Sequence, residues 1–272
     1  MFRAFACFLL ASSTLMGAMP EREPWLSSFL TSTLALEQSH MEASKLHTDR
    51  GKKRGYYHAE KTSVIASLTA YPGFSSEARL DLTHTQKKNY GFDAISVRGE
   101  YALFSDLSGD CVSMTGGGEL LFSPISRICD LSSQNHSPIE VKAHLAVGKE
   151  FGYSGSRFYR IAASASVGKG TRGAAWMEVD AFIQKVFVES HYLSLFFVSE
   201  HGCSHHHLSS RKHFRGWATV GYTFGDVGVR YELHKNWLGV FYSEIRTRVF
   251  AHDTLSKAWG ARIGVQMPFS LL

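Results

Sequence analysis

The sequence is poor in proline, cysteine and charge, and it lacks long apolar runs. Only 6 of its 272 residues are proline, 4 are cysteine, and 19% are charged. Beyond the N-terminal segment, no window holds the roughly 20 consecutive apolar residues of a membrane-spanning helix. The hydrophobic share of 44% excludes a largely disordered chain. Aromatic residues at 13% and 24 glycines fit many strands with tight turns, which favours a single all-β domain.

The formal charge of +5 does not identify an anionic partner. Basic residues alternate with nearly as many acids and do not gather into one stripe, so we expect no nucleic-acid partner. Cys7 lies in a segment that we expect to be removed, which leaves Cys111, Cys129 and Cys203 as candidates for disulfides within the chain or with neighbours. No metal-ligand spacing occurs among these cysteines, and we predict no cofactor and no metal site.

The N-terminal segment, residues 1–18, has the pattern of a secretory signal peptide. Arg3 precedes an apolar run from Ala4 to Leu10, and small residues follow up to Ala18. We therefore expect an exported protein.

Residues 19–61 are predicted to form a short helix and a basic linker that precede the main domain. Apolar residues between 25 and 41 recur at spacings of three and four, which is typical of one helical face. Residues 45–61 contain Lys52, Lys53 and Arg54 and no apolar periodicity. The basic run is interpreted as a solvated segment that contacts anionic lipid headgroups at most.

From residue 62 to residue 272 the apolar residues follow a period of two. In the last segment Trp259, Ala261, Ile263 and Val265 alternate with small or polar residues such as Arg262. The pattern predicts about twelve strands, with a range of about 10 to 14. They are expected near 62–71, 75–86, 92–104, 111–122, 138–151, 156–169, 174–188, 191–200, 214–224, 227–234, 237–250 and 257–269. At Gly225 and Asp226 the phase flips, so a hairpin turn or a bulge is expected there.

The alternation fits two architectures that differ in which face is buried. A soluble secreted barrel with an apolar ligand places the apolar set inside, whereas an antiparallel transmembrane β-barrel places it outside, against lipid. The long strands, the aromatic residues near strand ends and the secretory signal favour the second architecture. The expected location is therefore the bacterial outer membrane, with outer-membrane lipid around the barrel.

The last strand, residues 262–269, resembles the C-terminal signal of bacterial outer-membrane β-barrel proteins. Arg262 is followed two residues later by Gly264 and then by alternating hydrophobic and aromatic residues up to Phe269. The resemblance implies that the barrel-assembly machinery recognises this strand. The chain departs from the family pattern because Pro268 interrupts the motif and three residues follow Phe269.

In a transmembrane barrel the polar set lines the lumen, and here it contains as many acids as bases. Two interpretations stay open: cross-strand ion pairs that fill a narrow lumen, or a positive constriction around Glu244, Arg246, Arg248 and Arg262 that contacts solute. The residues predicted to line the pore are Glu244, Arg246, Arg248, Arg262, Arg230, Glu232, Arg79 and Asp81.

The segment from His201 to His213 is rich in histidine, with His205, His206 and His207 in succession. Such a run offers imidazole ligands, but no carboxylate lies among them to orient the rings, so a solvated loop is the preferred interpretation. With twelve predicted strands, this segment and residues 123–137 fall on the periplasmic side, where barrel turns are usually short. The strand assignment therefore contains an inconsistency.

The expected function is that of a porin-like channel for small solutes. One alternative is a structural or adhesive surface barrel that does not conduct. Another is a membrane-embedded lipid hydrolase, for which His191 and Ser194 lie close in the sequence. Neither residue has the surroundings of a known enzyme motif, so we predict no catalytic residues.

Overall fold

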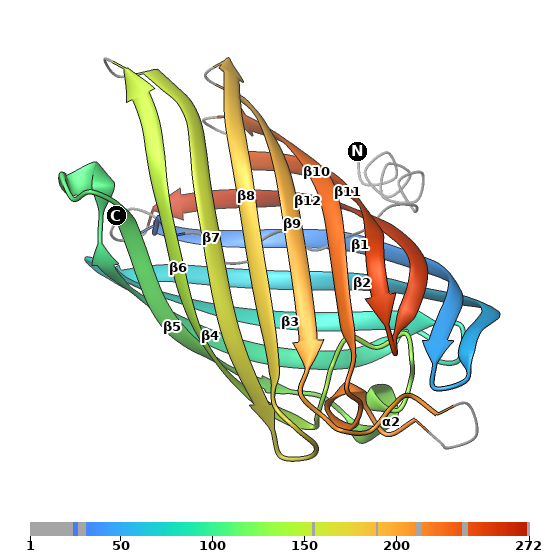
Figure 1. Ribbon diagram of the computed structural model, residues 1–272. Helices are drawn as coiled ribbons and strands as arrows, with labels where there is room; N and C mark the ends of the chain where they lie inside the picture. Colours follow the sequence, from blue (N-terminus) through green and yellow to red (C-terminus); the bar gives the residue numbers. More distant parts are fainter. Residues whose placement is uncertain are drawn as a thin grey trace, which may run out of the picture.

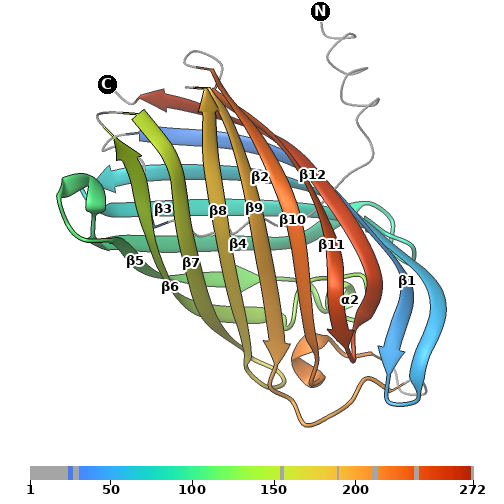
Figure 2. The same cartoon turned by 45° about the horizontal axis from the view of Figure 1, so that its top comes forward.

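A computed structural model describes residues 24–26, 31–153, 156–188, 190–209, 214–235 and 239–270. They form a closed antiparallel barrel in which each strand pairs with its sequence neighbours and β1 pairs with β12 (Figures 1 and 2). Within these residues no helix is long and apolar enough to cross a membrane. The strands are β1 (Thr31–Thr48), β2 (Gly51–Tyr71), β3 (Phe74–Thr85), β4 (Gly91–Phe104), β5 (Ser113–Phe122), β6 (Ile139–Tyr153), β7 (Ser156–Gly170), β8 (Trp176–Val188), β9 (His191–Gly202), β10 (Thr223–Lys235), β11 (Gly239–His252) and β12 (Leu255–Ser270).

The barrel is inverted relative to a soluble protein. Val97 and Ile245 point outward with exposed fractions of 56% and 57%, whereas Glu244 and Asp180 point inward with 2% and 1%. The same sense holds around the barrel, because the exposed set is dominated by branched apolar side chains and the buried set by polar ones. The predicted barrel is confirmed, and the interpretation as a soluble barrel with an apolar interior is wrong. An apolar outer face of this kind is suited to contact with lipid acyl chains.

The helix predicted over 25–41 is wrong in the part that the structure describes. Strand β1 occupies Thr31–Thr48, with Leu34 exposed on the outer face and Glu37 buried in the lumen. The basic segment predicted as a linker is the β1–β2 hairpin, and Lys52 and Lys53 lie at its exposed tip. A helix here would leave the backbone groups of β2 and β12 unpaired at the seam, which is why tertiary pairing overrides the local apolar spacing. The predicted signal peptide, residues 1–18, lies outside the described residues.

The strand predicted over 214–224 is also wrong. These residues, apart from the start of β10, belong to the connection between β9 and β10, which includes the 3₁₀-helix η2 (Trp217–Thr219). Trp217, Val220 and Tyr222 are buried against the inner side of the barrel rather than paired in the sheet, and the spacing of two between Val220 and Tyr222 is what resembles a strand. The sequence pattern missed β1 and predicted one strand too many at 214–224. The predicted total of twelve strands is therefore correct although these two assignments are wrong.

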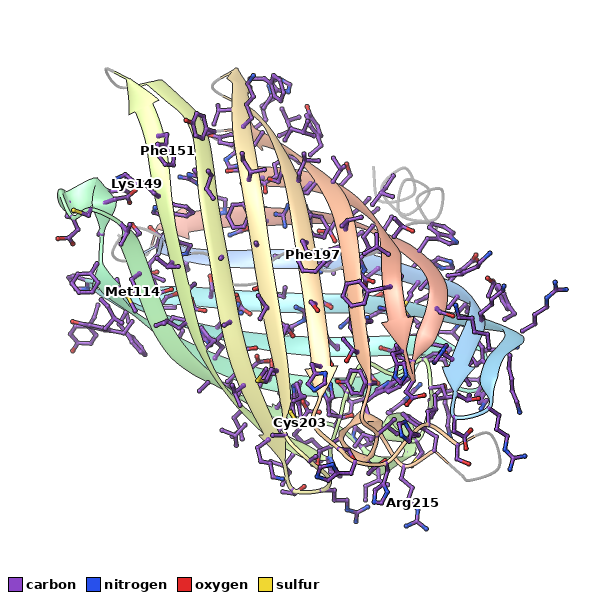
Figure 3. The ribbon with its side chains drawn as sticks, in the orientation of Figure 1. Met114, Lys149, Phe151, Phe197, Cys203 and Arg215 are labelled. Carbon is purple, nitrogen blue, oxygen red and sulfur yellow. The ribbon has the colours of Figure 1, made fainter. Side chains whose placement is uncertain are left out.

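With β1 present and no separate strand between β9 and β10, the two long connections no longer fall on the same side as the chain termini. Both long connections, residues 123–138 and the described residues of 203–222, lie at the end of the barrel opposite the termini, which we call the loop end. The end where β1 begins and β12 ends is the terminal end. Figure 1 shows the short helix α2 (Ile125–Ile128) and the connection before β10 together below the strands. Figure 3 places Cys203 and Arg215 at this end, and Lys149 and Phe151 toward the other.

The predicted irregularity at Gly225 and Asp226 is a bulge within β10, not a turn. The register of β10 against β11 shifts between these two residues. The three cysteines of the described chain are free and exposed. Cys111 lies in the β4–β5 connection at the terminal end, whereas Cys129 and Cys203 lie at the loop end, so Cys111 is too far from the other two for a disulfide within one chain.

Candidate functional site

The lumen is crossed by a group of ion pairs that we call the charged belt, centred on Glu37 and Arg79. The Arg79 guanidinium lies 3.3 Å from the Glu37 carboxylate and 2.9 Å from that of Asp81. On the other side of Glu37, Arg262 lies at 3.4 Å. Lys61 reaches Asp81 at 3.2 Å, and Tyr242 donates a hydrogen bond to Glu37. The belt therefore joins β1, β2, β3, β11 and β12 through side chains that are nearly inaccessible to solvent.

A second cluster lies around Asp226, at the bulge of β10. Its carboxylate is 2.7 Å from Arg248 Nε and 3.5 Å from Arg246 Nη1. Arg248 also donates to the Leu255 carbonyl oxygen at 2.8 Å and stacks over the Phe224 ring. One buried carboxylate thus holds two guanidinium groups.

Nearer the terminal end, Arg230 and Glu232 form a pair within one strand. The distance between Arg230 Nε and Glu232 Oε1 is 2.9 Å, and the guanidinium carbon lies 4.0 Å from the centre of the Tyr242 ring. Arg98 of β4 pairs with Glu100 of the same strand at 3.5 Å and with Glu77 of the neighbouring β3 at 2.8 Å. These pairs satisfy charges in a confined space where an isolated charge would cost several kcal/mol.

Glu244 differs from the other acids of the lumen. It is 2% exposed, and neither carboxylate oxygen accepts a hydrogen bond from any residue that the structure describes. In the sheet it lies opposite Arg262 on one side and Arg230 on the other. Its surroundings are therefore positive, although both neighbouring arginines direct hydrogen bonds or ion pairs to other carboxylates.

In the wall formed by β7, β8 and β9, a buried apolar cluster faces the lumen, and we call this cluster the neutral wall. Its members are Ala162, Phe182, Phe196 and Val198. Charged side chains lie on the same three strands: Asp180 is 1% exposed and accepts a hydrogen bond from Ser164, and Glu200 pairs with His136. The lumen therefore combines ion pairs with one apolar surface.

At the terminal end the neutral wall is covered by Trp25, which precedes β1. The indole packs on the apolar cluster, with its ring 6.5 Å from that of Phe182, and the Arg160 guanidinium lies 5.0 Å above it. Trp25 Nε1 donates to Asp106 Oδ1 at 3.0 Å, and Asp106 belongs to the short helix η1 (Asp106–Ser108). Residues 24–26 therefore occupy part of the lumen at this end.

At the loop end the two long connections fold into the barrel mouth and contact each other. Trp217 Nε1 donates to the Ser133 carbonyl oxygen at 2.7 Å. Gly216 has φ +109°, and a Cβ there would lie 2.8 Å from the His136 carbonyl oxygen, so only glycine permits this approach. Leu208, Trp217, Val220 and Tyr222 pack on Met41, Ala43 and Leu46 of β1, Ala59 of β2, and Leu255 and Ala258 of β12.

His136 anchors this closure from the 123–138 connection. Its Nε2 lies 2.7 Å from Glu200 Oε1 and 2.7 Å from the Tyr222 hydroxyl, and its ring stacks on Trp176 with 4.0 Å between ring centres. Burial alone disfavours the charged imidazole, but Glu200 and Glu140 outweigh it and raise the pKa of His136 to about 9. The imidazole is therefore protonated near neutral pH and ties both connections to the wall.

Within the part of the chain that the structure describes, two cavities lie in the lumen. One, of about 160 Å³, lies at the loop end and is lined by His136, Trp217 and Tyr222 together with Arg246 and Arg248. The other, of about 240 Å³, lies at the terminal end and is lined by residues that include Trp25, Glu37, Arg230 and Arg262. Arg79 lines both. The charged belt is thus the boundary between two chambers along the axis.

All eight residues predicted to line the pore point into the lumen or its walls. Arg79, Asp81 and Arg262 meet through Glu37, and Arg246 and Arg248 meet through Asp226. The arrangement matches the interpretation in which ion pairs fill the lumen, because the arginines of the expected positive constriction lie against carboxylates. The sequence reasoning missed Glu37, which it placed on a helix, and Asp226, which it placed at a turn or bulge without a role in the lumen. The alternation of Thr33, Ala35 and Glu37 with Leu34 and Leu36 is the signal that identifies Glu37.

The structure separates the pair considered for lipid hydrolysis. Ser194 is fully buried and accepts a hydrogen bond from the Gln184 amide at 3.2 Å. His191 bonds the Tyr231 hydroxyl at 2.6 Å on the outer side of the barrel. Being three residues apart on one strand, the two side chains face opposite sides of the sheet and do not form a nucleophile with its base.

No family model and no curated protein sequence matches the chain. Solved structures do match. The COG4313 outer membrane channel from Pseudomonas putida F1 has a TM-score of 0.64 at 8% identity, over 93% of this chain and 100% of that chain. The NanC porin has a TM-score of 0.54 at 10% identity, over 86% and 98%. The KdgM porin has a TM-score of 0.52 at 12% identity, over 86% and 99%. At these identities the likeness establishes the fold: this chain has the twelve-stranded barrel fold of outer-membrane channels.

Proposed function

We propose that this chain is a porin-like channel of the bacterial outer membrane that passes small polar solutes. The observation that carries the proposal is the lumen itself, which holds two cavities that share Arg79 in their lining, inside a closed barrel with an apolar outer face. A purely structural barrel needs no cavities and gains stability from filling them. The similar solved structures, an outer membrane channel and two porins, support the same function.

Passage requires the terminal end to open. Residues 24–26 and the charged belt lie in the path between the two mouths. Trp25 is held by one side-chain hydrogen bond and by ring contacts, and the ring contacts are worth about 0.5 to 1.5 kcal/mol each. A movement of this segment therefore costs little compared with a rearrangement of the wall. The solute then passes between the charged belt and the neutral wall, which suits a molecule with both polar and apolar faces.

The partners follow from the two surfaces of the strands. Lipid acyl chains cover the outer face, and the last strand, which contains residues 262–269, is proposed to engage the barrel-assembly machinery before it pairs with β1. Disulfide bonds of Cys111, Cys129 or Cys203 with neighbouring proteins stay a prediction, and their exposure is the property that such bonds need.

The test is conductance in planar bilayers. Protein extracted from membranes is first checked for a boiling-dependent shift in gel mobility, which establishes a closed barrel. We expect discrete current steps and an increase in mean conductance in Trp25→Ala. A folded barrel that produces no steps, in either the parent chain or Trp25→Ala, would show a non-conducting structural barrel and overturn the proposal.

A further inference from the structure

Three distant segments meet at the rim of the loop end, and each brings a metal-ligating side chain. The end of β1 carries His47, the β11–β12 turn carries His252 and Asp253, and the 203–222 connection carries His207. Backbone hydrogen bonds fix the meeting point: His47 N donates to Thr254 O at 2.9 Å, and Asp49 N donates to Leu208 O at 3.1 Å. The backbone of the fold therefore brings these three segments together.

The side chains converge on the Asp253 carboxylate. One ligand atom from each of His47, His252 and Asp253 lies within 4.8 Å of the others. Asp253 Oδ1 is 3.8 Å from His47 Nδ1, and Oδ2 is 3.5 Å from His252 Nδ1. The fourth group, His207, has its Nδ1 at 2.6 Å from Oδ2. Three imidazoles thus surround one carboxylate from three sides.

We propose that His47, His207, His252 and Asp253 form a binding site for a divalent transition metal of the Zn²⁺ type. Imidazole nitrogen and carboxylate oxygen are ligands that Zn²⁺ takes in tetrahedral geometry. With bonds of about 2.0 to 2.1 Å, tetrahedral ligand atoms lie about 3.4 Å apart. The ligand atoms of His47, His252 and Asp253 lie within 4.8 Å of one another, so their spacing is at most about 1.4 Å wider than this, and the exposed rings of His252 and His207 rotate to bring their nitrogens closer.

The carboxylate is held in place before the metal arrives. The Asp253 side chain is only 2% exposed, and the residue has φ +50° in the β11–β12 turn. Its backbone N–H donates to His47 Nδ1 at 3.1 Å, which keeps that ring beside it. On metal binding, the lone pair of His47 Nδ1 would bind the metal and would no longer accept this hydrogen bond. The ring centres of His47 and His252 are 4.9 Å apart, so a single ion reaches both.

The histidine run in the sequence has no neighbouring carboxylate to orient its rings, and the fold provides one. No carboxylate lies among His205, His206 and His207, but the fold supplies Asp253 from a turn 46 positions further along the chain. A metal here would link the 203–222 connection to the barrel rim, next to the buried Leu208 that packs on β1. The site lies outside the lumen chambers and does not depend on the chain being a channel.

The experiment uses the full chain purified in detergent, with Zn²⁺ as the calorimetric probe and Co²⁺ as the spectroscopic probe. We expect one equivalent of Zn²⁺ to bind and Co²⁺ to give the absorption bands of tetrahedral coordination. His252→Ala and Asp253→Asn should each weaken binding by about a hundredfold or more, since loss even of outer partners costs about 10- to 100-fold. Asparagine is chosen because it tolerates positive φ.

His205→Ala is the matched control, because His205 is exposed in the same histidine run and is not one of the four proposed ligands. Its binding should equal that of the parent chain, and all variants should keep the boiling-dependent mobility shift. Two results overturn the proposal: no binding by the folded parent chain, or binding that survives both His252→Ala and Asp253→Asn but is lost in His205→Ala. Because binding is measured without current, failure here is distinct from failure of the channel proposal.

Discussion

The two ends of the lumen are closed in different ways. At the loop end two connections interlock, with buried apolar side chains against three strands and a protonated histidine between carboxylates. At the terminal end a short stretch, residues 24–26, lies on the neutral wall through one indole. Local opening follows the contacts that must be broken. We therefore infer that the packed loop end is the more stable of the two ends, and that the terminal end is the mouth that opens more readily.

The largest expected effect is at the loop end. Trp217→Ala removes a side chain that is 6% exposed and leaves a cavity among the residues of both connections and β1. We expect a loss of roughly 3 to 5 kcal/mol in the free energy of unfolding, measured by urea titration in detergent. Trp217→Phe keeps most of the ring and loses the bond to Ser133, so its loss should be about 1 kcal/mol. Equal stability of Trp217→Ala and the parent chain would show that the closure is not packed.

The complementary change is Trp25→Ala at the terminal end. The substitution removes the ring that covers Phe182 and the hydrogen bond to Asp106. We expect conductance to rise severalfold, while the free energy of unfolding changes by only about 1 kcal/mol. Trp25→Phe retains the ring and should give an intermediate conductance. A stability loss as large as that of Trp217→Ala would contradict the distinction between the two ends.

The third prediction concerns pH and applies only to the loop end. Glu200 and Glu140 raise the pKa of His136 to about 9, above the ordinary value of 6.5. The stabilisation is therefore fully present below pH 6.5 and is lost as the pH rises through about 9. Unfolding titrations across this range should show stability falling with pH in the parent chain. In His136→Gln the fall should be weaker, because the imidazole that Glu200 and Glu140 stabilise in its charged form is absent.

The smallest effect is expected at Glu244, between the two ends. Because its carboxylate oxygens accept no hydrogen bond from the described residues, Glu244→Gln breaks no pair. It leaves Arg230 and Arg262 beside a neutral group, so the reversal potential should shift modestly toward anion selectivity. Glu37→Gln is the contrasting variant, since it leaves Arg79 and Arg262 without a charged partner at Glu37 and should reduce stability. If the two variants had the same stability and the same reversal potential, the ion pairs of the charged belt would not be what holds the side chains of the lumen in place.

Much of the barrel could be predicted from the sequence because alternation reports directly which face is apolar. The period of two located most strands from β3 onward and assigned residues such as Asp81 and Arg230 to the inside. The same rule failed at β1, where apolar residues at a spacing of three and four gave a helical pattern over a segment whose backbone completes the seam. It also failed at Val220 and Tyr222, where a connection that folds inward gives a spacing of two without a sheet.

Pairing partners could not be predicted, since they depend on register across strands. Arg79 and Arg262 are far apart in the sequence, and they share Glu37 only because β1 lies between β2 and β12. Likewise, Asp226 faces Arg248 because the bulge in β10 displaces the register by one residue. These contacts arise from barrel closure, so no local window of the sequence contains them.

The seam between β1 and β12 also bears on how the barrel is assembled. Residues at opposite ends of the chain become neighbours there, as in the pairing of Leu46 with Leu255 and of Thr31 with Ser270. Contacts of such long sequence separation form late and slowly, because their loop-closure entropy is lost before other contacts repay it. Until the seam forms, β1 and β12 each present an unpaired edge that another chain can extend. Glu37 and Arg262, which meet across this seam, are therefore among the last ionic contacts to form, and the charged belt becomes complete only when the barrel has closed.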